Sequence, residues 1–167
     1  MNAIPEDVVD LIGKPCFPQV SDCQVEAGAI RSFAAAVEDG FPAFWTDEAD
    51  NMLAPPALLS AWNRSLMWAP EGKGEGSGLA LHFLLKRKLG LPRAVVAETE
   101  TELADPIRPG VRVKCEQVLV DVGEPCTTRL GEGRYWTIRV EYRCAATGAF
   151  FGAETMRFFG YGREADT

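Results

Sequence analysis

The chain has 167 residues, of which 47% are hydrophobic and 25% are charged, a composition typical of an ordinary soluble globular protein. Its 24 Asp and Glu residues outnumber 17 Lys and Arg, and the net charge of -7 disfavours a nucleic acid as the main partner. This length predicts a single domain over residues 1–167, with an N-terminal arm and first strand in 1–24 and a C-terminal tail in 160–167.

The start of the sequence lacks the pattern of a secretion signal. Residues 1–7 are acidic, whereas the start of such a signal is basic. No apolar run approaches the roughly 20 residues that a membrane-spanning helix needs. We therefore expect a cytoplasmic protein without a membrane span.

Neither the cysteines nor the acidic residues form a pattern typical of a metal site. The five cysteines are an odd number, and none has the spacing of a metal-binding pair, so we expect reduced cysteines in the core or in strands. The acidic loop 44–53 has no histidine nearby and is expected to be solvated. The one histidine, His82, lies in an apolar helical run and is expected to pack in the core.

The first half of the chain predicts three main helices. Residues 28–39 place apolar side chains at helical spacing, and Asp39 with Gly40 ends that run. Residues 54–68 are apolar on most faces and begin with prolines, which predicts a buried helix. A third helix, 79–89, ends in a basic cluster that suits the helix dipole, with contact to an anion such as a nucleotide phosphate as the alternative.

The second half of the chain has the alternation of strands. Residues 95–103, 111–122, 135–144 and 150–159 predict an antiparallel meander. Helices first and strands afterwards predict an α+β domain, in which helix 54–68 must be buried on nearly every side. We therefore expect the hotdog fold, an antiparallel curved sheet wrapped around this central apolar helix. Its open edge is expected to pair with a second copy or a relative.

Four short motifs follow one another along the chain. They are Val25-Glu26 with Gly28, Ile30, Phe33 and Ala34; Asp39 with Pro42; Ala54-Pro55-Pro56; and Asp105-Pro106-Ile107 with Pro109-Gly110. Together they resemble the MaoC-like dehydratases over residues 25–159, in particular their fatty-acid-synthase-type dehydratase branch. Residues 54–62 and 130–133 are similar to the MaoC-like domain of the larger subunit of heteromeric enoyl-CoA hydratases that act on steroid side chains.

Members of this family add water to the double bond of a 2-enoyl thioester, or remove it, with an Asp and a His on the loop after the first helix. The reaction needs a base, a proton donor and hydrogen-bond donors at the thioester carbonyl. Asp39 matches the family aspartate, but Phe41 stands at the Asn position and Phe44 at the His position. Phenylalanine cannot carry a proton, so the resemblance implies a subunit that is inactive alone and retains Asp39 as an incomplete catalytic site.

The resemblance further implies a site for an acyl-CoA substrate, with no metal and no cofactor besides the coenzyme A of that thioester. The expected binding residues are Phe41, Phe44, Trp45, Pro55 and Pro56. A MaoC-like hotdog subunit, or a second copy of the chain, would complete the enzyme, and the finer resemblance implies a role in steroid side-chain degradation.

Other interpretations of these residues stay open. Asp39 could simply end a helix by bonding backbone amides, and the aromatic residues could belong to the core or to an interface. Several cations are candidates for contact with CoA phosphates, and the sequence does not choose among Arg93, Arg108, Arg112 and Lys114. A non-enzymatic acyl-CoA-binding or regulatory hotdog module and a hotdog thioesterase are the alternative functions.

Overall fold

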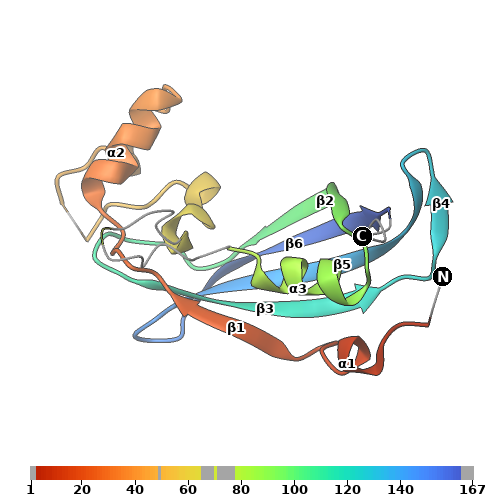
Figure 1. Cartoon of the computed structure of the whole chain (residues 1–167). Helices are drawn as coiled ribbons and strands as arrows, with labels where there is room; N and C mark the ends of the chain where they lie inside the picture. The colour runs from red at the N-terminus through yellow and green to blue at the C-terminus, as the bar shows by residue number, and fades with distance from the viewer. Residues whose placement is uncertain (1–2, 49, 65–69, 71–77, 163–167) are drawn as a thin grey trace.

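The structure is a computed structural model that describes residues 3–48, 50–64, 70 and 78–162. Within these residues the chain forms a six-stranded antiparallel sheet in the order β1-β3-β5-β6-β2, with β4 paired to β5 (Figure 1). The strands are β1 (Pro15–Val20), β2 (Arg93–Leu103), β3 (Val113–Val122), β4 (Cys126–Thr128), β5 (Gly131–Cys144) and β6 (Phe150–Tyr161). The helices are α1 (Glu6–Val9), α2 (Ala27–Ala36) and α3 (Ala80–Lys88), with 3-10 turns η1 (Pro42–Phe44), η2 (Pro56–Leu58) and η3 (Ala61–Asn63).

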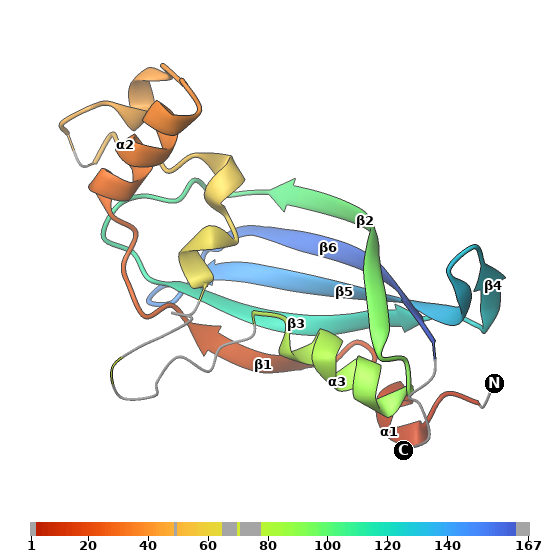
Figure 2. The same cartoon turned by 45° about the horizontal axis from the view of Figure 1, so that its top comes forward.

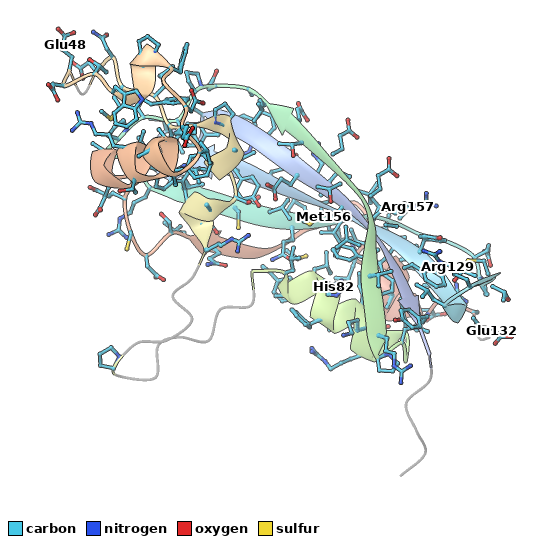
Figure 3. The ribbon with its side chains drawn as sticks, turned by 90° about the horizontal axis from the view of Figure 1, so that it is seen from above. Glu48, His82, Arg129, Glu132, Met156 and Arg157 are labelled. Carbon is cyan, nitrogen blue, oxygen red and sulfur yellow. The ribbon has the colours of Figure 1, made fainter. Side chains whose placement is uncertain are left out.

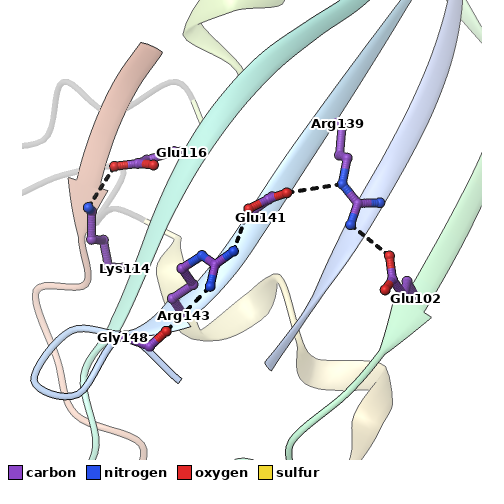
Figure 4. Close-up of polar contacts among 7 residues, drawn as sticks. All are labelled: Glu102, Lys114, Glu116, Arg139, Glu141, Arg143 and Gly148. Atoms are coloured by element: carbon purple, nitrogen blue, oxygen red, sulfur yellow. Dashed lines mark hydrogen bonds and ion pairs between the residues drawn. The ribbon is translucent and has the colours of Figure 1, made fainter. Parts of the chain in front are cut away.

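The two faces of the sheet differ because β3 and β5 alternate buried and less buried residues. On the outer face, Arg139 bridges Glu102 at 2.6 Å and Glu141 at 3.3 Å, and Arg143 adds a second cation at 2.9 Å from Glu141 (Figure 4). These ion pairs link β5 to β2 across the intervening strand β6. The outer face is therefore a charged, solvent-facing surface, and the apolar core lies on the inner face.

Helix α3 covers part of the inner face, as Figures 1 and 2 show. It buries Leu81, His82 and Leu85 against the sheet. The backbone N–H of Leu81 donates to the Gln117 side chain at 3.0 Å, which ties the start of the helix to β3. The expected packing of His82 is thereby confirmed, and its ring lies 4.3 Å from that of Phe158, measured between centroids.

The buried helix predicted for residues 54–68 is wrong over its described part. The chain there forms η2 and η3 and is extended at Arg64 (ψ 124), while residues 65–68 lie outside the described residues. Asn63 explains this outcome, because its side chain donates to the Val113 carbonyl at 2.6 Å and accepts a bond from the Cys115 thiol at 2.9 Å. Such side-chain bonds compete with helix formation. The helix held by the sheet is instead the nine-residue α3, which was predicted as the third helix.

The other elements follow the sequence prediction with shifted ends. Strands β3, β5 and β6 form the expected meander, but β2 lies beside β6 at the far edge rather than beside β3. Strand β4 was not predicted, and β6 continues through Tyr161 into the segment assigned to the tail. The sequence also predicts a surface loop in the glycine-rich run 70–78, most of which lies outside the described residues. Among the helices that are described, none combines the length and apolar character needed to cross a membrane.

Candidate substrate-binding site

An apolar pocket of about 350 Å³ lies between the segment 41–59 and the adjoining ends of β2 and β6. Its walls include Leu53, Leu59, Leu103 and Phe151. Asp105 is the one charged residue among the described residues that line it. A pocket of this size and lining suits an apolar group rather than an ion.

Backbone hydrogen bonds hold the pocket walls together. The N–H of Ala54 donates to the Ile107 carbonyl at 2.8 Å, and the N–H of Ala104 donates to the Phe151 carbonyl at 3.0 Å. Leu53 is fixed by its own N–H, which donates to the Ala43 carbonyl at 3.0 Å. The first bond joins the segment 41–59 to the loop after β2, and the second joins that loop to β6, so the pocket is built by residues far apart in the sequence.

Four of the residues expected to bind substrate line this pocket: Phe41, Phe44, Pro55 and Pro56. Pro42 starts the η1 turn, and that turn places the Phe44 side chain in the core at 5% exposure. Phe41 is 53% exposed, and its ring meets that of Phe44 edge to face with centroids 5.1 Å apart. Phe44 is thus part of the inner wall, while Phe41 lies at the rim.

Asp39 and Trp45 are not among the residues that line the pocket. The Asp39 carboxylate accepts a hydrogen bond from the Phe41 N–H at 2.9 Å, and the Asp39 carbonyl accepts one from the Trp45 indole at 2.8 Å. Both residues are exposed. These contacts shape the turn between α2 and η1, which matches the helix-ending interpretation of Asp39. The structure therefore places Asp39 two residues before Phe41 at the rim of the pocket.

A polar group that the sequence analysis did not single out lies on the inner face of the sheet beside the pocket. The Tyr142 hydroxyl donates to the Glu154 carboxylate at 3.4 Å, and Ser60, which follows the pocket residue Leu59, lies near this hydroxyl. Burial raises the pKa of the Tyr142 hydroxyl, and the nearby charge of Glu154 raises it further. The hydroxyl therefore stays a neutral donor.

The sequence does contain a signal for this group. Glu154 faces Val140 across the β5–β6 ladder, so its carboxylate shares the apolar face of the sheet. An acidic residue on the apolar face of a strand is unusual, so its position is a candidate for a buried polar contact. Its partner Tyr142 lies on another strand, and sequence alone does not pair them.

The histidine that the chain does possess is remote from the pocket lining. His82 packs against Trp136 and Phe158 beneath α3 and is not among the pocket residues. Burial, with a smaller contribution from Lys86, lowers its pKa from 6.5 to about 4, so the ring is neutral at pH 7. Among the described lining residues the pocket therefore has apolar binding surface but no histidine to transfer a proton.

Comparison with known proteins places this geometry in a family. The family model described as the FAS1-like, dehydratase domain region matches residues 10–145. No sequence among the curated proteins matches the chain.

Several solved structures are similar to the chain. One is the ChsH1-ChsH2 complex from Mycobacterium tuberculosis, with 20% identity, a TM-score of 0.74, and coverage of 96% of this chain and 92% of that chain. The MaoC-like dehydratase from Rhodospirillum rubrum has 20% identity, a TM-score of 0.54, and coverage of 98% and 100%. The HadBC (3R-hydroxyacyl-ACP dehydratase) complex from Mycobacterium tuberculosis has 17% identity, a TM-score of 0.53, and coverage of 86% and 95%.

At these identities the solved structures establish the fold, and the predicted α+β hotdog architecture with an open antiparallel sheet is confirmed. The family match covers most of the chain and includes the α2–η1 turn and the segment 41–59 that forms the pocket. The chain belongs to the family described as the FAS1-like, dehydratase domain region, and it has the hotdog fold.

Proposed function

We propose that this chain is a subunit of a heteromeric 2-enoyl-CoA hydratase, in which it binds the acyl group and a MaoC-like partner carries the complete Asp and His pair. The observation that carries the proposal is Phe44. It stands at the family's histidine position, and its ring is a 5% exposed wall of the apolar pocket. A buried hydrocarbon at that position favours binding of an apolar acyl group over proton transfer.

The pocket supports the acyl-binding role. Burial of apolar surface contributes about 25 cal/mol per Å², so an acyl chain or ring system gains affinity in proportion to the area it buries. Phe41 at the rim adds exposed apolar surface for a bulky substrate, such as the steroid side chain suggested by residues 54–62. Asp39 would supply a carboxylate near the rim, and water activation would come from the partner.

The sheet edges support a partner. Strand β1 is a poor pairing edge because Pro15 and Pro18 lack N–H donors and Phe17 has a left-handed backbone (φ 51). Strand β2 has 11 residues, contains no proline and is almost entirely exposed beyond its pairing with β6. We propose that a hotdog partner, either a relative or a second copy, pairs along β2.

Ala104→Trp tests the acyl site directly. Ala104 is exposed at the pocket, so the indole should fill the cavity without disturbing the core. The affinity for a long-chain enoyl-CoA, measured by calorimetry, should fall at least tenfold, while the affinity for free CoA should not change. The matched control is Ala146→Trp, at an exposed position in the β5–β6 turn outside both the pocket and β2, which should bind like wild type. Equal affinity in both variants would place the acyl group elsewhere.

The same preparations separate the alternative functions. An acyl-CoA-binding module would bind the thioester but support no hydration with any partner. A thioesterase would release free CoA thiol from an acyl-CoA without a partner. Hydration that requires both subunits, without thiol release, is the outcome that the proposal predicts.

A further inference from the structure

A second, polar groove of about 980 Å³ lies where the end of α3, the start of β2 and the turn before β5 meet. Figure 3 shows Glu132, one of its residues, at the end of the molecule opposite Glu48 in the loop after η1. Four of its described lining residues are basic and one, Glu132, is acidic; the basic ones are Arg87, Lys88, Arg93 and Arg134. This local excess of positive charge contrasts with the net charge of -7 for the whole chain.

The four cations are not equally available to a ligand. Lys88 is paired with Asp7, and the 5% exposed Arg134 donates to the Gly123 carbonyl at 3.2 Å. Arg87 and Arg93 are exposed, and within the described residues neither forms an ion pair or a side-chain hydrogen bond. Two guanidinium groups therefore face the groove with their donors free, and such groups bind phosphates through paired hydrogen bonds.

Stabilisation of the helix dipole explains only part of this arrangement. Cations in the last turn of α3 offset the negative end of its dipole, and that role accounts for Arg87 and Lys88. It does not account for Arg93 on β2 or for Arg134 on β5, which belong to other elements and line the same groove. Convergence of cations from three elements is the feature expected of an anion site.

We propose that this groove binds the phosphate groups of the nucleotide part of coenzyme A. The identity of the ligand rests on the proposed function, in which the substrate is a CoA thioester. Among the four cations that the sequence offered for this role, the structure favours Arg93. Arg108 is bonded to the Asp50 carbonyl, Arg112 donates to the Ser21 carbonyl at 3.2 Å, and Lys114 is paired with Glu116.

The position of the groove indicates which pocket it serves. Arg93 and Leu103 are the first and last residues of β2, so groove and apolar pocket lie about 33 Å apart in one chain at 3.3 Å per residue. Antiparallel pairing of β2 with the equivalent strand of a partner brings Arg93 of one subunit beside the end of the strand that borders the other subunit's pocket. The phosphates and the acyl group of one substrate would then contact different subunits.

Calorimetric titration of the purified full chain with adenosine 3′,5′-bisphosphate tests the groove. Binding should be measurable at low salt, weaken as salt rises, and fall at least tenfold in Arg87→Ala/Arg93→Ala. The matched control is Arg64→Ala, an exposed arginine at the end of η3, which should bind like wild type. An unchanged thermal unfolding curve in the double variant shows that the effect is local. No binding, or an equal loss in the control, would overturn the proposal.

A second probe, 4′-phosphopantetheine, separates the nucleotide from a single phosphate on a carrier arm. It should bind at least tenfold more weakly than the bisphosphate, and equal affinity would overturn the nucleotide assignment. The bisphosphate has neither acyl chain nor thioester, so its failure to bind would remove the groove and leave the hydratase proposal intact. If the mixture with a MaoC-like partner showed no hydration while the bisphosphate still bound, the hydratase proposal would fall and the groove would remain a phosphate site.

Discussion

His82 shows how a single residue can make the fold sensitive to pH. It is 9% exposed on the side of α3 that faces the sheet, and within the described residues its Nδ1 has no hydrogen-bond partner. Desolvation and the charge of Lys86 disfavour the imidazolium, which sets the folded-state pKa at about 4 against 6.5 for the free side chain. Between these values the unfolded chain binds more protons than the folded one.

We therefore predict that His82 costs stability in acid. Its contribution is constant above pH 6.5, falls as the pH drops from 6.5 to about 4, and reaches a loss of about 3 kcal/mol at most. His82→Leu removes this titration and should be neutral or slightly stabilising at pH 7.5, since it also removes an unpaired buried nitrogen. Urea unfolding of both proteins at pH 7.5 and pH 4.5 measures the effect. A stability difference between them that does not change with pH would contradict it.

At the scale of elements, the sequence pattern predicted those helices and strands whose structure is determined by residues close together in the sequence. The alternation of residues 135–144 predicted β5, and the apolar helical run before the basic cluster of 79–89 predicted α3. The helix predicted over 54–68 is wrong in the described residues 54–64, because several apolar residues there line the pocket and Asn63 bonds to β3. Those contacts join residues about 50 positions apart, which no local pattern contains.

The candidate site divides in the same way. The family motif led to four of the pocket residues, Phe41, Phe44, Pro55 and Pro56, because these four lie close together in the sequence. The Tyr142–Glu154 pair and the basic groove depend on strand register and on the meeting of α3 with β2 and β5. Such relations appear only when the elements are placed in space.

Strand β2 yields a prediction about assembly. Val96 is 57% exposed on this edge strand, so Val96→Asp should place a charge in the proposed interface and shift the protein toward monomer. The matched control is Val20→Asp, because Val20 is 48% exposed on the opposite edge strand β1 and should leave the oligomer intact. Light scattering after size-exclusion chromatography measures both. Dissociation by Val20→Asp alone would assign the interface to β1.

At the scale of the whole molecule, the hotdog sheet presents an apolar pocket and a basic groove at opposite ends of β2, with one exposed edge between them. The apolar pocket has Phe44 in its wall, and its described lining residues include no histidine. A pocket with acyl-binding surface and without a proton-transfer pair is the expected form of a subunit that needs a partner.

The most direct test is the hydration of a 2-enoyl-CoA by this chain alone, by a MaoC-like subunit that carries an Asp and His pair, and by the two together. We predict that this chain alone binds the thioester without hydrating it. The hydration rate of the mixture should exceed the sum of the rates of the two subunits measured separately. Hydration by this chain alone at rates typical of enzymes, about 1 s⁻¹ or faster, would contradict it.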